Sequence, residues 1–450
     1  MALWNVRGTF GRKADSLVAA AMFASDAAAT GAVSVPVDTS HAAALLDHPA
    51  QLPAKRVDVA KRLSLGIVGT RGIPARHGGF ETFAEHLALY LVERGWDVTV
   101  YCQTPGRGPI SEDQWHGVKR VLIPISVSGA LGTILFDWQA ARHASKQQNL
   151  VLTLGYNTAI MSLFYRATGT RQLINMDGLE WQRNKWRFHE KAWLFVNERL
   201  GCWLGHHLIA DHPEIENHLA TRVRNDKITM IPYGAAEILA ADPARLEPLG
   251  LTPGSYALVI ARPEPENSIL EIVRAFSRVQ RNYQLVVLGN YDPVVNRFHR
   301  SVIEAASEEV IFPGAIYDAA TVQALRFHAR LYIHGHTVGG TNPSLVEAMA
   351  AGSPVLAYDN RFNRWVAVDA AHYFSDEDSC AIALDSLLRD DAWLQKLGTA
   401  ARARFLENFR WSGILEEYEQ LLASWAPEAA RQSPEQPETN IRALVKKHPR

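Results

Sequence analysis

One segment near the C-terminal end of the chain restricts the fold more than any other, because it reads as a strand, a glycine turn, a helix and a second strand in succession. Residues 330–334 (RLYIH) predict a short buried strand, and Gly339–Gly340 permit a sharp turn of the backbone. Asn342 and the proline after it are typical of a helix N-cap and first turn. Gly352 ends the helix before residues 355–358 resume as a strand. This order predicts an α/β fold with parallel strands.

The same glycine turn predicts a site for an anion. A helix that begins on such a turn presents free N–H groups and the positive end of its dipole, and both stabilise a phosphate. Glu347 lies one helical turn further on, on the same face as Pro343 and Ser344. There its carboxylate could accept hydrogen bonds from sugar hydroxyls beside the phosphate. The alternative is an ordinary surface glutamate on a helix that follows a tight turn.

Strand-like and helix-like segments alternate along most of the chain. The first set of apolar runs comprises residues 63–69, 97–102, 118–124, 150–155, 172–176 and 207–210. The second set comprises residues 257–261, 285–289, 310–313, 331–334 and 355–358. Helical patterns separate most of these runs, which predicts two Rossmann-like, doubly wound domains that face each other across a central cleft. We place the N-terminal domain at residues 62–235 and the C-terminal domain at residues 236–425.

The composition is that of a globular chain with more than one core, because 47% of its 450 residues are hydrophobic and 21% are charged. A formal net charge of −1 gives no general attraction to nucleic acid, which is therefore not an expected partner. The three cysteines are far apart and lack CxxC spacing, which indicates reduced thiols in a cytoplasmic protein and predicts no metal site.

The two ends of the chain differ from the rest in composition. Residues 1–61 are alanine-rich with interspersed charges, which predicts a flexible extension, with a targeting peptide as the alternative. No stretch there reaches the ~20 apolar residues that a membrane-spanning helix needs. Residues 426–450 are rich in proline and charge and predict a flexible tail.

Residues 69–81 (GTRGIPARHGGFE) form a second glycine-rich loop, after the first predicted strand. Arg71, Arg76 and His77 supply donors for an anion, and the helix that starts near Gly79 points its N-terminus at the loop. The loop has neither the GxGxxG order of a dinucleotide fold nor the GK[ST] of a Walker loop. Both NAD binding and ATP hydrolysis are therefore disfavoured. A flexible turn without function is the alternative.

A third cluster, within residues 173–187 (LINMDGLEWQRNKWR), directly follows an apolar strand. At such a strand end Asp177 could orient a hydroxyl or accept its proton, and tryptophans such as Trp181 offer flat faces on which sugars stack. A neighbouring strand ends at residues 155–158 (GYNT), which we expect to line the same cleft. The alternatives are a helix cap at Asp177 and tryptophans that belong to the core.

Arg262, within VIARPEPENSI, closes another predicted strand. The rigid fork of donors on an arginine suits a diphosphate at this position. Glu264 and Glu266 are close in sequence, so a surface ion pair is the alternative.

Together these segments resemble retaining glycosyltransferases of the GT-B fold, of the family-four type. More narrowly, they resemble bacterial rhamnosyltransferases that build surface polysaccharides. The resemblance covers about residues 63–422 and rests on GIVGTRGIPARHGGFETFAEHLALYL, LGYN, NMDGLEWQRNKW, ARPEPEN, HGHTVGGTNPSLVEAMA and YDNRFNR. Several long motifs in one order are far more specific than any one of them alone.

The resemblance implies a nucleotide-diphosphate sugar donor, dTDP-rhamnose, and neither a metal nor a further cofactor. The implied catalytic residues are Asp177, Arg262 and Glu347. The implied donor-binding residues are Gly78, Gly79, Phe80, Arg262, Asn267, His336, Gly339, Gly340, Thr341, Asn342, Pro343, Ser344, Leu345 and Glu347. The implied acceptor-binding residues are Arg71, Arg76, His77, Tyr156, Asn157, Asp177, Trp181 and Arg183. In this arrangement the glutamate binds the ribose and the arginine stabilises charge on the departing phosphate.

Two positions depart from the superfamily pattern. Gly339 stands eight positions before Glu347, where the superfamily usually has a glutamate, and His334 or His336 could substitute for it. Asn267 stands where the superfamily often has a lysine. The narrower rhamnosyltransferase group resembles this sequence at both positions.

The acceptor implied by the resemblance is a lipid-linked saccharide at the inner face of the cytoplasmic membrane. Peripheral membrane contact through residues 181–188, Trp193 and Trp203 is a hypothesis based on aromatic and basic residues together. Two other classes stay open: a GT-B-type epimerase or hydrolase of nucleotide sugars, and a non-catalytic nucleotide-sugar sensor.

Overall fold

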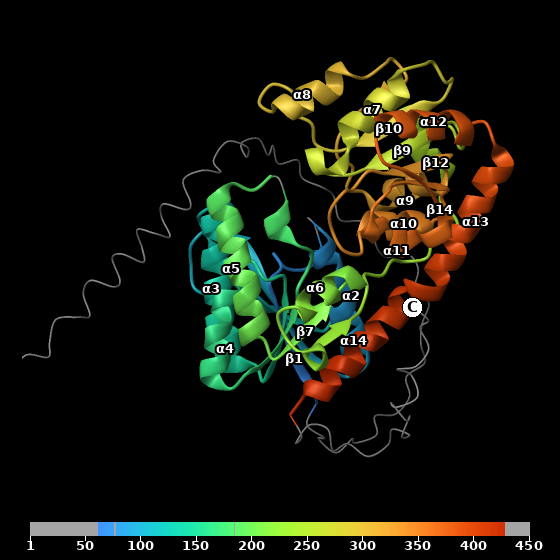
Figure 1. The fold of residues 1–450 in the computed structure, drawn as a ribbon. Coiled ribbons are helices and arrows are strands. Elements are labelled where there is room, and N and C mark those ends of the chain that lie inside the picture. The colour runs from blue at the N-terminus through green and yellow to red at the C-terminus, as the bar shows by residue number, and fades with distance from the viewer. Residues whose placement is uncertain (1–61, 76–77, 184, 428–450) are drawn as a thin grey trace, which may run out of the picture.

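The computed structural model describes residues 62–75, 78–183 and 185–427, which form two α/β domains (Figure 1). The predicted extension at residues 1–61 lies outside the described residues, as does all but the start of the predicted tail at residues 426–450. None of the helices in the described ranges combines the length and the hydropathy that crossing a bilayer requires.

The sheet of the first domain has the strand order β3-β4-β2-β1-β5-β6-β7-β8. The strands are β1 (Ser64–Val68), β2 (Asp97–Pro105), β3 (Ser111–Trp115), β4 (Val118–Ile125), β5 (Leu150–Leu154), β6 (Arg171–Asn175), β7 (His207–Ala210) and β8 (Ile228–Met230). Neighbours pair in parallel except β3 and β4, which are antiparallel. The prediction of a parallel sheet missed this edge because β3 (SEDQW) is polar and mostly exposed, so it has no apolar pattern.

The sheet of the second domain has the order β11-β10-β9-β12-β13-β14 and is parallel throughout. Its strands are β9 (Tyr256–Ile260), β10 (Gln284–Leu288), β11 (Val310–Ile311), β12 (Leu331–His334), β13 (Val355–Tyr358) and β14 (Ala371–Phe374). The five strands predicted for this domain are confirmed. The sequence did not indicate β14, because β14 (AHYF) contains a histidine and is only partly buried, so it has no continuous apolar run.

Helices cover both faces of each sheet. The first domain contains α2 (Gly79–Glu93), α3 (Gly129–Gln147), α4 (Ser162–Thr168), α5 (Phe188–Leu204) and α6 (Pro213–Ala220). The second contains α7 (Ile269–Ser277), α8 (Arg297–Glu304), α9 (Ala319–Phe327), α10 (Pro343–Ala350), α11 (Arg361–Ala367), α12 (Glu377–Leu387) and α13 (Asp391–Asn408), and α14 (Trp411–Trp425) follows. Successive residues of β9 pack alternately into two cores, Ala257 and Val259 on the side of α7, Tyr256 and Leu258 on the side of α9.

The strand order reverses beside β1 in the first sheet and beside β9 in the second. In an open parallel sheet, the loops that leave the strands on either side of such a reversal open a crevice at the carboxyl edge. In this chain the described parts of those loops are residues 69–75, 78 and 155–158 in the first domain, and residues 261–268 and 335–342 in the second. The segments with predicted chemistry therefore lie where each sheet can bind a ligand.

The last helix, α14, returns to the first domain, beside which Figure 1 shows it in red. Trp411, Ile414 and Tyr418 belong to the same buried cluster as Phe83 of α2. The side chain of Glu419 accepts hydrogen bonds from the Tyr90 hydroxyl and the Trp96 indole, each at 3.1 Å. The predicted C-terminal domain, residues 236–425, is thus wrong in including α14. An amphipathic helix at this position carries no signal that tells which domain it covers.

Candidate active site between the two domains

The predicted glycine turn and helix are confirmed. Asn342 is the N-cap of α10, and its side chain accepts a hydrogen bond from the backbone N–H of Ser344 at 3.1 Å. Pro343 is the first residue of the helix, and Gly352 just beyond it has a φ of 70°, which favours glycine. The positive end of α10 therefore faces the turn formed by residues 338–342.

The N-termini of α10 and α2 meet across the domain interface. A Cβ added to Gly79, the first residue of α2, would lie 3.2 Å from Cγ of Pro343. The hydroxyl of Tyr233 donates a hydrogen bond to the Gly79 carbonyl at 3.3 Å. Two helix dipoles, one from each domain, thus point their positive ends at one place, which suits an anion with more than one negative charge.

The glycine turn also touches the loops that follow β6 and β7. A Cβ on Gly178 would lie 3.5 Å from the backbone of Gly339, so these loops approach through glycines. The backbone N–H of Thr341 donates to Oδ2 of Asp211 at 3.0 Å, and the Thr341 hydroxyl donates to the Asp211 carbonyl. These contacts close the two domains on each other.

Asp177 follows β6 with a φ of 52°, and its N–H donates to the Asn175 side chain at 3.0 Å. It caps no helix, because the next helical turn begins at Glu180 with Leu179 as its N-cap, so the helix-cap alternative is wrong. Burial and the nearby charge of Glu180 raise the pKa of Asp177 to about 6, although the positive charges of Arg183 and Arg262 lower it. Asp177 and Arg262, predicted from distant segments, therefore lie close enough to interact.

Arg262 is exposed and forms no ion pair within the described parts of the chain, so the surface ion-pair alternative is wrong. Glu266 pairs instead with Arg183 of the first domain at 3.0 Å, and Arg183 also contacts Glu180 at 2.6 Å. Asn267 donates to the carbonyl of Arg262 at 2.8 Å and so shapes the loop that presents the arginine. The guanidinium of Arg262 is left available to a ligand.

Glu347 forms an ion pair with Arg326 of α9, whose side chain is 9% exposed, whereas that of Glu347 is 31% exposed. The carboxylate is thus held in place and can still be reached. Ser344, by contrast, uses its hydroxyl within the protein, since it donates to the Ile260 carbonyl at 3.1 Å and contacts the Tyr332 hydroxyl. Its backbone N–H is already bound by Asn342, so this serine is less free than the sequence predicted.

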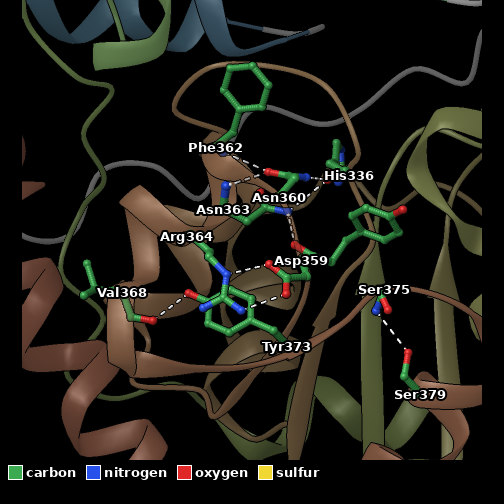
Figure 2. Close-up of polar contacts among 11 residues, drawn as sticks. His336, Asp359, Asn360, Phe362, Asn363, Arg364, Val368, Tyr373, Ser375 and Ser379 are labelled. Atoms are coloured by element: carbon green, nitrogen blue, oxygen red, sulfur yellow. Dashed lines mark hydrogen bonds and ion pairs between the residues drawn. The ribbon is translucent and has the colours of Figure 1, made fainter.

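His334 and His336 stack at the end of β12, with ring centroids 4.3 Å apart and planes 7° from parallel. Burial lowers the pKa of His334 to about 3, and burial together with the neighbouring ring lowers that of His336 well below its usual value. Both nitrogens of His334 and Nδ1 of His336 are buried without a partner among the described residues. Figure 2 shows how Asn360 and Asn363 fix the loop, by donating to the His336 carbonyl at 2.8 and 2.9 Å.

Two of the predicted acceptor residues, Tyr156 and Asn157, lie in the loop after β5. The Tyr156 hydroxyl accepts from the Glu180 N–H at 2.9 Å and donates to the Gly178 carbonyl at 3.2 Å, which fixes the loop that carries Asp177. The Asn157 carbonyl accepts from Trp193 at 2.9 Å.

Trp181 is half-buried against Phe195 and donates to Glu198, so its environment is that of a core residue, the alternative left open from the sequence. Arg71 is exposed, whereas Arg76 and His77 lie outside the described residues. Of the remaining predicted donor residues, Gly78 precedes α2, the ring of Phe80 faces Gly155, and Leu345 is buried in α10.

The sequence did not indicate Asp211 as part of this site. It directly follows β7, much as Asp177 lies two residues after the neighbouring β6, and a polar residue after a buried apolar strand was the signal that could have found it. Within the described ranges no group of three or more His, Cys, Asp or Glu side chains is arranged to hold a metal ion.

Comparison of this chain with solved structures identifies its fold. Sucrose-phosphate synthase from Thermosynechococcus elongatus has a TM-score of 0.69 and 20% identity, over 81% of this chain and 99% of that one. Anabaena HepE in complex with UDP and glucose has a TM-score of 0.64 and 15% identity, over 81% of this chain and 100% of that one. The chain therefore has the GT-B fold, as predicted.

Two family models then match the two domains. Residues 63–236 match a domain of unknown function (DUF1972), and residues 247–404 match the glycosyl transferases group 1. Phosphatidyl-myo-inositol mannosyltransferase of Mycobacterium leprae (strain TN) is 32% identical over 174 residues, 36% of this chain and 45% of that protein. The chain thus matches less than half the length of this curated relative. Residues 247–404 are therefore similar to the glycosyl transferases group 1.

Proposed function

We propose that the protein is a retaining glycosyltransferase that takes a sugar from a nucleotide-diphosphate donor. The meeting of the α2 and α10 N-termini carries this proposal, because it offers two sets of N–H donors to one diphosphate. The group 1 match of residues 247–404 and the UDP complex of the HepE neighbour support the same ligand class.

The residues around this point have separate roles in the proposal. The N–H groups of Gly339, Gly340 and Asn342, which have no acceptor among the described residues, hold the diphosphate. Arg262 stabilises the charge that develops on the departing phosphate. Glu347, held by Arg326 but still accessible, binds the ribose hydroxyls. Asp177 faces the acceptor and orients its hydroxyl.

The transfer breaks the bond between the anomeric carbon and the phosphate oxygen and forms one from that carbon to the acceptor oxygen. Attack on the face that the phosphate leaves retains the anomeric configuration. The departing phosphate oxygen accepts the proton of the acceptor hydroxyl, so no protein base is required. Arg262 and the helix N-termini stabilise the negative charge that develops on the departing phosphate. They do so effectively because fixed dipoles need no reorganisation during the reaction.

We further propose that the donor is dTDP-rhamnose and the acceptor a lipid-linked saccharide of a surface polysaccharide. The motif resemblance supports both, and the lipid in the name of the mannosyltransferase relative agrees with a lipid-linked acceptor. The test incubates the purified protein in EDTA with a panel of nucleotide sugars and a synthetic lipid-diphosphate saccharide, and follows product by mass. Glu347→Ala and Arg262→Ala are assayed beside it.

Transfer of a 6-deoxyhexose that both variants lose supports the donor and the site together. Release of free sugar or an isomer without acceptor indicates the hydrolase or epimerase, and donor binding without turnover indicates the sensor. Transfer of another sugar rejects rhamnose but leaves the glycosyltransferase proposal standing.

We also propose that the protein works in the cytoplasm, against the inner face of the cytoplasmic membrane. One face of α5, on the outside of the first domain in Figure 1, exposes Phe188 (88%), Val196 (52%) and Trp203 (61%). Arg199 on the same helix stacks over Phe195 with its guanidinium 4.9 Å from the ring centre. Apolar and basic groups together suit an anionic bilayer.

Sedimentation with vesicles that contain anionic lipid tests this surface. The wild type should co-sediment, and a variant with Phe188→Ser and Trp203→Ser should not. Ile382→Ser serves as the control, because Ile382 is 70% exposed in the second domain, between the values of Phe188 and Trp203. Equal sedimentation of all three proteins contradicts the α5 surface.

A further inference from the structure

The carboxyl group of Asp211 reaches from the first domain into the predicted phosphate turn of the second. Its Oδ2 accepts the N–H of Thr341 at 3.0 Å, and the Thr341 hydroxyl donates to the Asp211 carbonyl. A Cβ on Gly340 would lie 2.1 Å from Oδ1, so the carboxyl group packs directly against the turn. Thr341 was predicted to bind the donor, but its N–H is already occupied.

The second oxygen of this carboxyl group has no partner. Oδ1 is shielded from solvent and accepts no hydrogen bond from any described residue. A buried carboxylate oxygen without a donor is unfavourable, whereas a protonated one needs an acceptor. No described residue supplies either, and Oδ1 packs against Gly340 of the turn that is predicted to hold the diphosphate.

The charges around Asp211 also disfavour its ionised form. Asp177 approaches from the loop after β6, and Tyr418 approaches from α14. Thr341 approaches from the turn, and His212, the next residue, stays neutral because burial lowers its pKa to about 4. No described lysine or arginine forms an ion pair with Asp211. Burial and the charge of Asp177 raise the pKa of Asp211 to about 7.

We propose that Asp211 is a positioning residue of the donor site that holds the glycine turn against the first domain and takes up one proton when the diphosphate binds. This inference rests on the proposed function. In the bound state Oδ2 keeps the Thr341 N–H, and the negative charge of the nearby diphosphate favours the protonated, neutral carboxyl group. The proton comes from the solvent, and no covalent bond changes.

The direction in which donor affinity changes with pH follows from the protonated and ionised states of the Asp211 carboxyl group. A neighbouring diphosphate raises the pKa of Asp211 above its value in the free protein, so the donor binds best when the group is already protonated. Affinity is therefore full below about pH 7 and falls by up to about tenfold per pH unit above it.

The test uses the full chain and intact nucleotide sugars, dTDP-rhamnose and UDP-glucose, because a diphosphate esterified at both ends does not itself titrate in this range. Isothermal titration calorimetry between about pH 6 and about pH 8.5, in two buffers of different ionisation enthalpy, gives both the affinity and the number of protons taken up. At the upper end of this pH range we expect the protein to take up close to one proton for each nucleotide sugar that binds.

Asp211→Asn keeps an acceptor for Thr341 and is neutral at every pH, so the affinity of this variant for the donor should no longer depend on pH and its proton uptake should vanish. Asp226→Asn removes an equal charge at an exposed site of the first domain and should behave as wild type. If Asp211 merely supported the structure, Asp211→Asn would weaken donor binding equally at every pH and would not change the slope of affinity against pH.

Wild-type affinity that does not change with pH, or an Asp211→Asn slope equal to that of the wild type, overturns the inference while the donor site stands. Failure of the wild type to bind either nucleotide sugar at any pH overturns the donor site as well. If Asp211→Asn does not fold, the wild-type proton uptake alone decides the matter, since zero uptake contradicts the inference.

Discussion

The hydroxyl of Tyr418 connects α14 to the loop that carries Asp177, and its removal should destabilise the protein measurably. Tyr418 is 1% exposed, and its oxygen accepts a hydrogen bond from Nδ2 of Asn175 at 2.9 Å. The other end of the Asn175 side chain accepts the N–H of Asp177 at 3.0 Å. One buried hydrogen bond thus links the last helix to a proposed catalytic residue.

Tyr418→Phe removes this bond but keeps the ring, which packs on Phe83 with centroids 4.6 Å apart. The buried amide of Asn175 then has no acceptor, a loss of about 1–3 kcal/mol in the free energy of unfolding. Tyr418→Ala also removes the ring from the core and should lose about 3–5 kcal/mol.

Urea denaturation followed by tryptophan fluorescence measures the change, with Tyr317→Phe, at an 80% exposed position, as the matched control. In an Asn175→Ala background, Tyr418→Phe should have little further effect, because the amide that loses its partner is absent. A Tyr418→Phe protein within about 0.5 kcal/mol of wild type would refute the reasoning about the unsatisfied amide.

Three further predictions concern charge. Arg262→Ala should unfold like the wild type, because the side chain is exposed and unpaired among the described residues, yet lower kcat by at least about a hundredfold in the transfer assay. Arg183→Met should cost about 3–5 kcal/mol in urea denaturation because it leaves the buried carboxylate of Glu266 without an ion-pair partner among the described residues, and adding Glu266→Gln should recover part of that loss. His334 binds a proton more readily unfolded than folded, so its contribution to stability is full above about pH 6.5 and is lost as the pH falls toward about 3. His334→Phe should therefore reduce the loss of stability between about pH 6 and pH 4 by about 1 kcal/mol per pH unit, and an unchanged pH profile would contradict the buried neutral state.

The parts of the site that local chemistry determines could be predicted from the sequence. Asn342, the proline after it and Gly352 specify where α10 begins and ends through backbone hydrogen bonds and dihedral angles, which depend on neighbours in the chain. The ends of buried strands, such as the one before Arg262, are equally local, so the sequence predicted most of the segments that gather at the interface.

Contacts between distant segments could not be predicted in this way. The ion pair of Glu347 with Arg326 and the contact of Asp211 with Thr341 join residues whose positions only the packed structure relates. That Glu347 and Arg262 bind a donor remains a prediction, and so does the acceptor site around Asp177. What the structure adds is that the guanidinium of Arg262 has no ion-pair partner in the described ranges, whereas Ser344 and Thr341 are hydrogen-bonded within the protein.

The return of α14 to the first domain has a consequence for biosynthesis. The core around Phe83 and Trp96 requires a helix that is translated only after every strand of the second sheet. The second domain, continuous in sequence from β9 to α13, can fold on the ribosome while the first still exposes the apolar surface that α14 will cover. We therefore expect the second domain to complete its folding before the first, although the first is synthesised earlier. A nascent chain stalled before Trp411 should expose the uncovered apolar surface of the first domain to a chaperone.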